Sequence, residues 1–407
     1  MDFYPLSEME IGDLTIVYKS IVYPQNAHKT PVILLSGILS SQEELTIEAK
    51  SLAQEFPVYT VDLPGLGGNF KQAEEVSLLE NTDYAVILKK FFDYLGLETV
   101  YLVGQSSSAS IAFTFASCFE ECVKKLILSG ITDQLRESVG FILGEAVGFL
   151  EKEEKEKFAS SIVLNMMNFS KRKKVQKSRE LKQSLYDSLR TCDDNGKQCY
   201  RANFLRLKNQ RELPKAPQCE VLILAGEYDN FTTPFESFEV SKKCPNSTFV
   251  LIKEADHMVT YEKRDVVTRV YRRYLNDASL KRMKDVEYFR KKDFPLERIR
   301  MEPRWFLNDT GFLDYGEGNC IPINVVDINN FGCRIFTSSS DHKTFSRKSK
   351  FVLHIPKEDI KVEVFIFKHA VNGHLRGIFK HYTFNKVKEF ESSIDKVAMR
   401  NNHAYGA

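Results

Sequence analysis

The stretch that decides the fold is Thr99-Val100-Tyr101-Leu102-Val103, followed directly by Gly104-Gln105-Ser106-Ser107-Ser108. Its apolar first half predicts a buried strand, and the run at 109–118 predicts a helix. A strand that turns sharply into a helix exposes a serine hydroxyl at the top of a sheet, where the helix N-terminus offers N–H groups to an oxyanion. Ser106 is therefore the candidate nucleophile.

A nucleophilic serine needs a base, and the base needs an orienting acid. When the serine lies on a strand-to-helix turn, the acid and then the histidine follow it along the chain. Before residue 300 the sequence contains only His28 and His257, and His257 comes just after an apolar run at 248–252. We therefore predict that His257 is the general base.

Three aspartates are candidates for the orienting acid. Asp229 follows the apolar run at 221–225, on a loop after a predicted strand. Asp256 precedes His257 directly, but a direct neighbour rarely points back at the ring. Asp133 follows another predicted strand at 126–130. The order of the elements favours Asp229.

Stabilising the oxyanion takes two N–H donors. One is expected from Ser107, the residue after the nucleophile. The other is expected from Ile38, because a predicted strand at 31–35 leads into Ser36-Gly37-Ile38 and glycine permits a close backbone approach. The segment at 62–67, Asp-Leu-Pro-Gly-Leu-Gly, predicts a tight turn under the site.

These landmarks together make residues 10–277 resemble the α/β-hydrolase fold. The sequence departs from that pattern at Ser36, where many members have histidine, and at Ser108, where the serine turn usually ends in glycine. The resemblance implies a serine hydrolase that acts on acyl esters or thioesters, with no metal or cofactor for catalysis. A serine nucleophile argues against epoxide hydrolases and haloalkane dehalogenases, which use aspartate.

The fold class predicted for residues 1–278 is α/β, with a doubly wound, mostly parallel sheet, because apolar strand patterns alternate with helical ones. A hairpin is expected at 14–23. The segment 134–217 is helical in pattern and predicts a cap. Its apolar side chains either pack the cap on the sheet or also line an acyl pocket. The basic run at 171–174 is either a solvated helix face or a docking surface for an acidic partner such as an acyl carrier protein.

The composition is typical of a globular cytoplasmic protein. The 407 residues are 43% hydrophobic with a formal net charge of +2, which argues against a general attraction to nucleic acid or membranes. The N-terminus does not resemble a signal peptide, and no apolar run is long enough to span a bilayer. The eight cysteines are scattered, and Cys192 and Cys199 lack the second pair that a zinc site needs.

The chain changes character after the hydrolase-like region. Residues 279–297 are rich in charge and predict a linker. Short strand patterns at 321–327, 333–336, 350–354 and 362–366 then predict a small all-β barrel over residues 298–407, with a final helix at 384–397.

This second region resembles the PilZ domain, whose ligand is cyclic di-GMP. The resemblance rests on Arg300 and Arg304, which form an R-x-x-x-R motif, and on Asp327, Asn329 and Gly332, which approximate D-x-S-x-x-G with asparagine in place of serine. Arginines can bind phosphates and the guanine edge in a forked geometry. Arg298 adds another guanidinium, and Trp305 either stacks on a base or joins the core. The alternative is a degenerate domain used for packing or as the interface of a homodimer.

The sequence thus predicts a bacterial cytoplasmic serine hydrolase regulated by cyclic di-GMP. The competing hypothesis is a catalytically idle hydrolase scaffold that acts as a cyclic di-GMP receptor and protein-interaction module.

Overall fold

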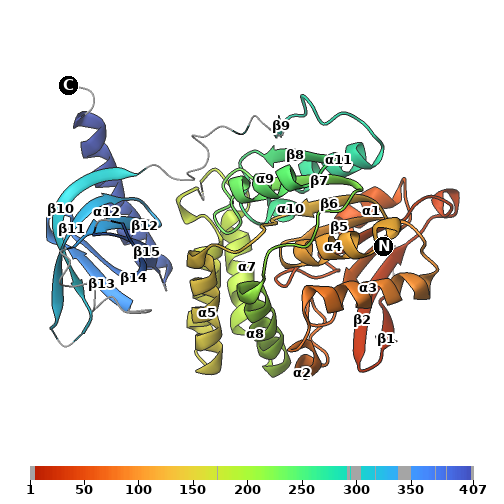
Figure 1. Ribbon diagram of the computed structural model, residues 1–407, viewed down its shortest axis with the longest axis horizontal. Coiled ribbons are helices and arrows are strands. Elements are labelled where there is room, and N and C mark those ends of the chain that lie inside the picture. The colour runs from red at the N-terminus through yellow and green to blue at the C-terminus, as the bar shows by residue number, and fades with distance from the viewer. Residues whose placement is uncertain are drawn as a thin grey trace. The chain divides into compact units, whose positions relative to one another are not determined.

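The computed structural model describes residues 5–171, 173–290, 294, 304–316, 318–337, 350–371, 373–381 and 383–404. The chain divides into two compact units (Figure 1), and nearly all residues of the second one lie in Arg300–Ala407. The first is an α/β unit and the second is a β-barrel. No helix among the described residues has the length and apolar character required to cross a membrane.

The α/β unit is built on a nine-stranded sheet with the order β1-β2-β4-β3-β5-β6-β7-β8-β9. Strands β3 to β8 run parallel, whereas β1, β2 and β9 run antiparallel to their neighbours. The strands are β1 (Ser7–Ile11), β2 (Leu14–Ile21), β3 (Val32–Leu35), β4 (Val58–Asp62), β5 (Val100–Gln105), β6 (Val123–Ser129), β7 (Glu220–Gly226), β8 (Ser247–Ile252) and β9 (Val286–Phe289). This confirms the predicted α/β fold class.

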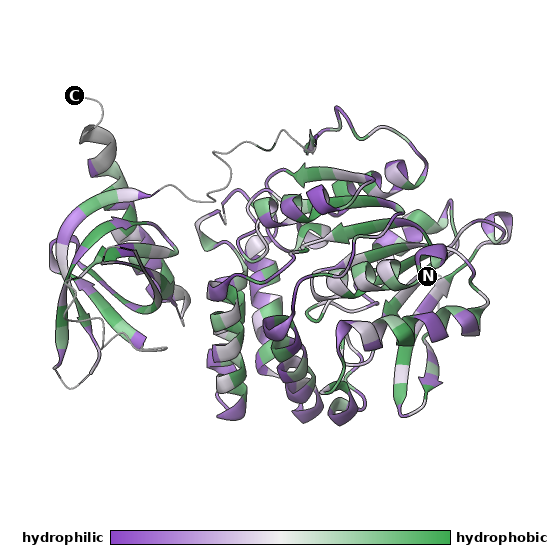
Figure 2. Cartoon of the chain, in the orientation of Figure 1, coloured by the Kyte–Doolittle hydropathy of each residue, from purple (hydrophilic) through white to green (hydrophobic). Residues whose placement is uncertain are grey.

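Helices cover both faces of this sheet, so its central strands are almost continuously apolar. Val32 and Leu34 of β3 point into one core, together with α1 (Thr46–Ala53) and α11 (Arg264–Leu275). The other face is covered by α3 (Asn81–Leu95), α4 (Ser107–Cys118) and α9 (Pro234–Lys243). Figure 2 shows hydrophobic colours along the central strands.

A helical insertion separates β6 from β7, as the sequence predicts. It contains α5 (Glu137–Glu151), α6 (Lys155–Met166), α7 (Ser178–Arg190) and α8 (Asp194–Asn209), with the short 3-10 turn η3 (Phe169–Lys171). Helices α5 and α8 pack against each other. The remaining short elements are η1 (Pro24–Asn26), α2 (Ala73–Val76), η2 (Glu120–Cys122) and α10 (Val259–Glu262).

The predicted position of the N-terminal hairpin was wrong. The hairpin joins β1 to β2 through Gly12, which has a φ of +61° that suits glycine in a tight turn. The range 14–23 instead contains the single strand β2 and the first residues of the loop that follows it. The side chains of β1 alternate between half-buried and exposed, so that strand carries little apolar signal.

The charged segment predicted as a linker contains a strand of the main sheet. Strand β9 pairs antiparallel with β8 at the sheet edge, and Val286 and Phe289 are buried. The Phe294 ring lies 4.9 Å from the ring of Phe238. An edge strand needs only one apolar face, and the few apolar residues of β9 are interspersed with charged residues such as lysine and aspartate. The sequence pattern therefore did not indicate a strand.

The second unit is a closed barrel with the order β10-β11-β12-β15-β14-β13, which confirms the predicted small all-β barrel. Its elements are β10 (Trp305–Asp314), β11 (Cys320–Ile328), β12 (Gly332–Phe336), β13 (Lys350–Ile355), η6 (Pro356–Glu358), β14 (Ile360–Val371), β15 (His374–Lys380) and α12 (Phe384–Ala404). The barrel core includes Phe390, Ile394 and Val397 of α12, and Trp305 packs against it. Strands β10 and β15 were missed, because Gly311 and Gly377 interrupt their apolar pattern.

Candidate active site

Ser106 lies at the sharp turn between β5 and α4, where the sheet strands present their carboxyl ends. Its φ of +52° and ψ of −120° are unusual for a residue other than glycine. Such a conformation is strained and persists only where the surrounding structure enforces it. Gly104 makes the turn possible, because a Cβ there would lie 2.6 Å from the Cβ of Ala112 on α4.

The serine in place of the last glycine of this turn is accommodated. The Ser108 side chain is fully buried, accepts a hydrogen bond from the Gln105 N–H at 2.9 Å and approaches the Leu35 carbonyl oxygen at 3.2 Å. Its hydroxyl therefore links the turn to the end of β3. This departure from the usual pattern adds hydrogen bonds and leaves the turn intact.

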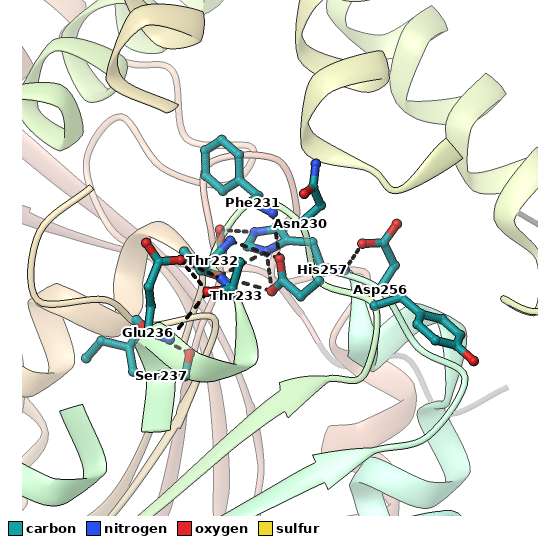
Figure 3. A network of polar contacts seen from close by, with 12 residues as sticks. Asn230, Phe231, Thr232, Thr233, Glu236, Ser237, Asp256 and His257 are labelled. Atoms are coloured by element: carbon teal, nitrogen blue, oxygen red, sulfur yellow. Dashed lines mark hydrogen bonds and ion pairs between the residues drawn. The ribbon is translucent and has the colours of Figure 1, made fainter. Parts of the chain in front are cut away.

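Three predicted residues meet in one hydrogen-bonded chain. The Ser106 Oγ lies 2.9 Å from Nε2 of His257, and Nδ1 of His257 lies 2.9 Å from Oδ2 of Asp229. A carboxylate can only accept, so the Nδ1 atom carries the hydrogen and Nε2 is left to accept a proton. Figure 3 shows the polar contacts around His257, with Thr232 and Asp256 on either side of it.

The Asp229 carboxylate is fixed by its own loop. Its Oδ1 accepts the N–H groups of Phe231 and Thr232, each at 2.9 Å. Its Oδ2 accepts the Thr232 hydroxyl at 3.0 Å in addition to the His257 ring. These contacts hold the carboxylate in one orientation, and Asp229 is 1% exposed, so its contact with the His257 ring is shielded from water.

The other two candidate aspartates make different contacts. Oδ1 of Asp256 accepts the backbone N–H of His257 at 2.8 Å. Asp133 accepts the Leu213 N–H and pairs with Lys243. The arrangement thus favours Asp229 as the orienting acid.

Two opposing effects act on the His257 ring. Burial disfavours the charged imidazolium, but the Asp229 carboxylate attracts it and accepts its hydrogen bond, and the result is a pKa raised above the ordinary value of 6.5. Burial and the nearby Asp229 charge raise the pKa of Asp256 to about 7. Burial also raises the pKa of Glu262, whose carboxylate accepts the Asp256 N–H.

The two predicted oxyanion donors lie side by side. The Ile38 N–H donates to the Ser107 hydroxyl at 2.8 Å. Ser107 is the first residue of α4, so its own N–H has no acceptor within the helix. Gly37 permits this approach, since a Cβ there would lie 3.1 Å from the Gln105 carbonyl oxygen.

Asp62 supports the loop that carries Ile38. Its carboxylate accepts the Ser36 hydroxyl, the Gln42 N–H at 2.6 Å and the Gly68 N–H at 3.1 Å. Burial raises its pKa to about 6. The turn at 62–68 is thus tied directly to the loop after β3, as expected for a turn under the site.

Sequence reasoning missed Asn168, which joins the cap to the acid and base loops. Asn168 is fully buried. Its N–H donates to Oδ2 of Asp256, and its Nδ2 donates to the Tyr228 carbonyl oxygen at 3.1 Å. These partners immediately precede His257 and Asp229. No pattern around Asn168 marks it, because the contact forms only in the folded chain.

Sequence reasoning also missed Arg206, a buried cation behind the nucleophile turn. Its guanidinium contacts the side chains of Asn203 and Asn81, approaches the Ser107 carbonyl oxygen at 3.5 Å and lies 5.2 Å from the Tyr84 ring centre. Burial lowers its pKa. Helical spacing gives a usable signal here, because Arg206 follows Cys199 and Asn203 on the buried face of α8.

A cavity of about 30 Å³ borders Ser106. The cap contributes Leu207 of α8 and Gln210, and Leu135 precedes α5. No residue of α5, α6 or η3 lines this cavity. The part of the cap that reaches the candidate nucleophile is therefore the end of α8.

The cysteines take no part in this arrangement. All eight lie in the described ranges and none of them forms a disulfide, Cys192 and Cys199 included. Within the described ranges, no group of three or more His, Cys, Asp or Glu side chains is placed to hold a metal ion.

In the barrel, four residues of the predicted nucleotide site, Arg304, Asp327, Asn329 and Gly332, are hydrogen-bonded locally. Arg304 and Arg334 both pair with Asp327, at 2.5 and 2.8 Å. Oδ1 of Asn329 accepts the N–H groups of Phe331 and Gly332 and closes a turn. At Gly332, a Cβ would lie 2.2 Å from the Gly377 carbonyl oxygen. Arg298 and Arg300 lie outside the described residues.

A family model described as the alpha/beta hydrolase fold matches residues 30–264. A Haemophilus influenzae protein with a provisional esterase/lipase name is 22% identical over 287 residues, which are 68% of this chain and 93% of that protein. A Thermogutta terrifontis esterase structure has a TM-score of 0.57 and 20% identity, and covers 67% of this chain and 98% of its own.

The alpha/beta hydrolase MGS-M2, from a Medee basin deep-sea metagenome library, has a TM-score of 0.60 at 17% identity, again over 67% of this chain and 98% of its own. At these identities the structural matches establish the fold alone. The family match ends before the barrel, so the PilZ-like identity of the barrel stays a prediction. Because the match spans more than half of the 407 residues, the chain belongs to the alpha/beta hydrolase fold family.

Proposed function

We propose that the chain is a serine hydrolase of carboxylic esters or thioesters, with Ser106 as nucleophile, His257 as base and Asp229 as orienting acid. The observation that carries this proposal is the unbroken contact from Ser106 Oγ through the His257 ring to Asp229, with both steps at 2.9 Å. A nucleophile and base within hydrogen-bond reach, with the base held by a third group, is the arrangement that acyl transfer needs.

In the first half-reaction, Ser106 Oγ attacks the carbonyl carbon while its proton passes to Nε2 of His257. The tetrahedral intermediate collapses, its bond to the leaving oxygen or sulfur breaks, and His257 returns the proton to that atom. A water molecule then gives a proton to His257 and attacks the acyl-serine. The acid departs and Ser106 regains its proton. Asp229 stabilises the imidazolium in both halves.

The oxyanion is stabilised by the N–H groups of Ile38 and Ser107. The Ile38 N–H donates to the Ser107 hydroxyl in the structure. When the negative charge forms on the carbonyl oxygen, the Ile38 N–H exchanges that hydroxyl for the oxyanion. A buried N–H with an acceptor in both states incurs no penalty for an unpaired donor.

The comparisons support this class of reaction. The Haemophilus influenzae relative has an esterase/lipase name, and the Thermogutta terrifontis structure is that of an esterase. The experiment that tests the proposal compares Ser106→Ala with Ser117→Ala, a control near the other end of α4. On a p-nitrophenyl ester, Ser106→Ala is expected to lose at least about a thousandfold in kcat/KM and Ser117→Ala to keep it. Equal activity of the two variants would refute the assignment.

The idle-scaffold hypothesis requires that Ser106 be unreactive. The shielded contact between Asp229 and His257 favours the enzyme over this alternative. An idle scaffold would be under no constraint to keep the Ser106 backbone in its strained conformation.

A second candidate function is binding of cyclic di-GMP by the barrel, with an effect on hydrolysis. The observation that favours it is a cavity of about 290 Å³ lined by Arg304, Phe306, Asp327, Arg334 and Arg376. Three guanidinium groups around one carboxylate leave excess positive charge for phosphates. Asp327 already pairs with Arg304 and Arg334, so its predicted contact with guanine requires an exchange of partners. The Asn329 side chain shapes the turn instead.

Calorimetry of the full chain with cyclic di-GMP tests this second candidate. Arg304→Ala is expected to weaken binding by about tenfold or more, since a charge-assisted bond is lost, whereas Lys388→Ala on the exposed side of α12 is not. Absence of binding heat at high micromolar ligand would instead favour a degenerate barrel used for packing or in a homodimer. Arg300, Asn329 and Gly332 remain predicted members of the cyclic di-GMP site. The cytoplasmic localisation of the protein also remains a prediction.

Docking of an acyl carrier protein also stays a prediction. Lys173, Lys174 and Lys177 are exposed on the segment before α7 and provide the positive charge that an acidic partner would contact.

A further inference from the structure

The cavity beside Ser106 is small. Its volume is about 30 Å³, and its apolar walls are Ile131, Leu135, Leu207 and Phe231. A cavity needs about 10–15 Å³ by this measure to hold one water molecule, whereas drug-sized ligands occupy sites of roughly 300–1,000 Å³. This cavity therefore has room for a group of a few atoms next to Ser106.

Part of the wall is held by the catalytic residues themselves. The Phe231 N–H donates to Oδ1 of Asp229, and the Phe231 ring meets the His257 ring at 5.2 Å in an edge-on arrangement. Ile131 is 2% exposed. This side of the cavity cannot move without disturbing Asp229 or His257.

The opposite side comes from the cap and is anchored too. Leu207 follows Arg206, whose guanidinium contacts Asn81 and Ser107. Leu207 and Leu135 are half-buried side chains. Leu135 and Leu207 therefore border the cavity on the cap side, and Leu207 directly follows the anchored Arg206.

The lining is also weakly polar. None of the side chains that line this cavity carries a charge. The hydroxyls of Ser110 and Thr132 donate to the carbonyl oxygens of Ser107 and Gln134. Since their hydrogens are already used, the walls favour an uncharged aliphatic group over a carboxylate.

We infer that this cavity is the acyl pocket and that it selects acyl groups of two or three carbons, so that acetyl and propionyl esters are the preferred substrates. This inference rests on the proposed function. A longer acyl chain would have to displace Leu135 and Leu207, and overfilling a packed apolar site is unfavourable. The alcohol or thiol leaving group lies on the other side of the carbonyl carbon. The inference therefore concerns the size of the acyl group and says nothing about the leaving group.

The test measures kcat/KM for p-nitrophenyl acetate, butyrate and octanoate, which share one leaving group. We expect acetate to exceed octanoate by at least about tenfold, because each misfit methylene is discriminated by roughly that factor in an apolar pocket. Leu207→Ala enlarges the cavity and is expected to raise the butyrate-to-acetate ratio by about tenfold. Leu205→Ala, a half-buried leucine of the same helix that does not line the cavity, is expected to leave the ratio unchanged.

The outcomes separate the inference from the function on which it rests. Octanoate hydrolysed as fast as acetate, or an equal change of the ratio in both leucine variants, would overturn the acyl-size inference while leaving Ser106 as the nucleophile. Inactivity on all three esters, together with a Ser106 that does not react with a fluorophosphonate, would overturn the proposed function as well. Acetate preference that relaxes only in Leu207→Ala supports the inference.

Discussion

The Ser106 hydroxyl oxygen lies 2.9 Å from Nε2 of His257, although 151 positions separate the two residues in the chain. Neither residue could be brought to this distance by local structure. The sheet does it, because β5 and β8 end at the same edge and each loop carries one partner. The contact is shielded, since His257 is 5% exposed. Several consequences can be measured.

The first prediction distinguishes the two aspartates near His257. Asp229→Asn is expected to lower kcat/KM by about ten-thousandfold, because an amide in place of the carboxylate favours the wrong ring tautomer. Asp256→Asn is expected to keep more than about a tenth of the activity, since the Asp256 carboxylate accepts the backbone N–H of His257 and not a ring N–H. Steady-state kinetics on one ester measures both. A larger loss for Asp256→Asn would transfer the role of orienting acid to Asp256.

The second prediction concerns pH. The base must be neutral to accept the Ser106 proton, and the pKa of His257 is raised above 6.5 by Asp229 against the opposing effect of burial. Activity is therefore expected to fall as the pH is lowered through that raised pKa, with the midpoint of the acidic limb above pH 6.5. A profile of kcat/KM against pH measures it. Full activity maintained at pH 5.5 would contradict the proposed role of His257.

The third prediction concerns the strand-to-helix turn. Gly104→Ala places a Cβ 2.6 Å from the Cβ of Ala112 and 2.8 Å from the Ser108 carbonyl oxygen. The variant is expected to lose about 1–3 kcal/mol of unfolding free energy, and activity with it, because the turn must shift. Gly148→Ala on α5 is the control, since no atom lies within 4 Å of its added Cβ. Urea unfolding of both variants checks this, and equal stability would argue against a tightly packed turn.

The fourth prediction concerns Asn168. Asn168→Ala removes the side-chain amide that donates to the carbonyl oxygen of the half-buried Tyr228. We expect a loss of about 1–3 kcal/mol in unfolding free energy and a fall in kcat/KM, because the loop of Asp229 loses its side-chain contact with the cap, whereas the Asn168 backbone N–H still donates to Asp256. The exposed Asn209→Ala serves as control. Unchanged kinetics in Asn168→Ala would show that the Asn168 side chain does not position the loop of Asp229.

Much of the fold could be predicted from the sequence, because the central strands are buried on both faces and are therefore almost continuously apolar. The runs that became β3, β5, β7 and β8 are apolar and end at glycine, serine or an acidic loop. Ser106, Asp229 and His257 were predicted as site residues from their order on those loops, and their side chains lie in contact in the structure. Edge strands were harder, since β1 and β9 bury only one face and mix apolar with charged residues.

The cap contributions could not be foreseen in the same way. Asn168 and Leu207 act through contacts between segments that are distant in the chain, and neither lies in a recognisable motif. Arg206 left a partial signal, because a charged residue on the buried face of a helix requires polar partners there. In the barrel, Asn329 stands at the serine position of the D-x-S-x-x-G motif, but its side chain accepts the Phe331 N–H and closes the local turn.

The most direct test of the central claim is the reaction of the full-length chain with a fluorophosphonate, followed by mass spectrometry of its peptides. Activated serines attack such reagents, and unactivated ones react slowly. The account predicts one rapid adduct, on Ser106, which is lost in Ser106→Ala and greatly slowed in His257→Ala. Adducts formed at the same rate in His257→Ala, or no adduct on Ser106 in the unaltered protein, would contradict it.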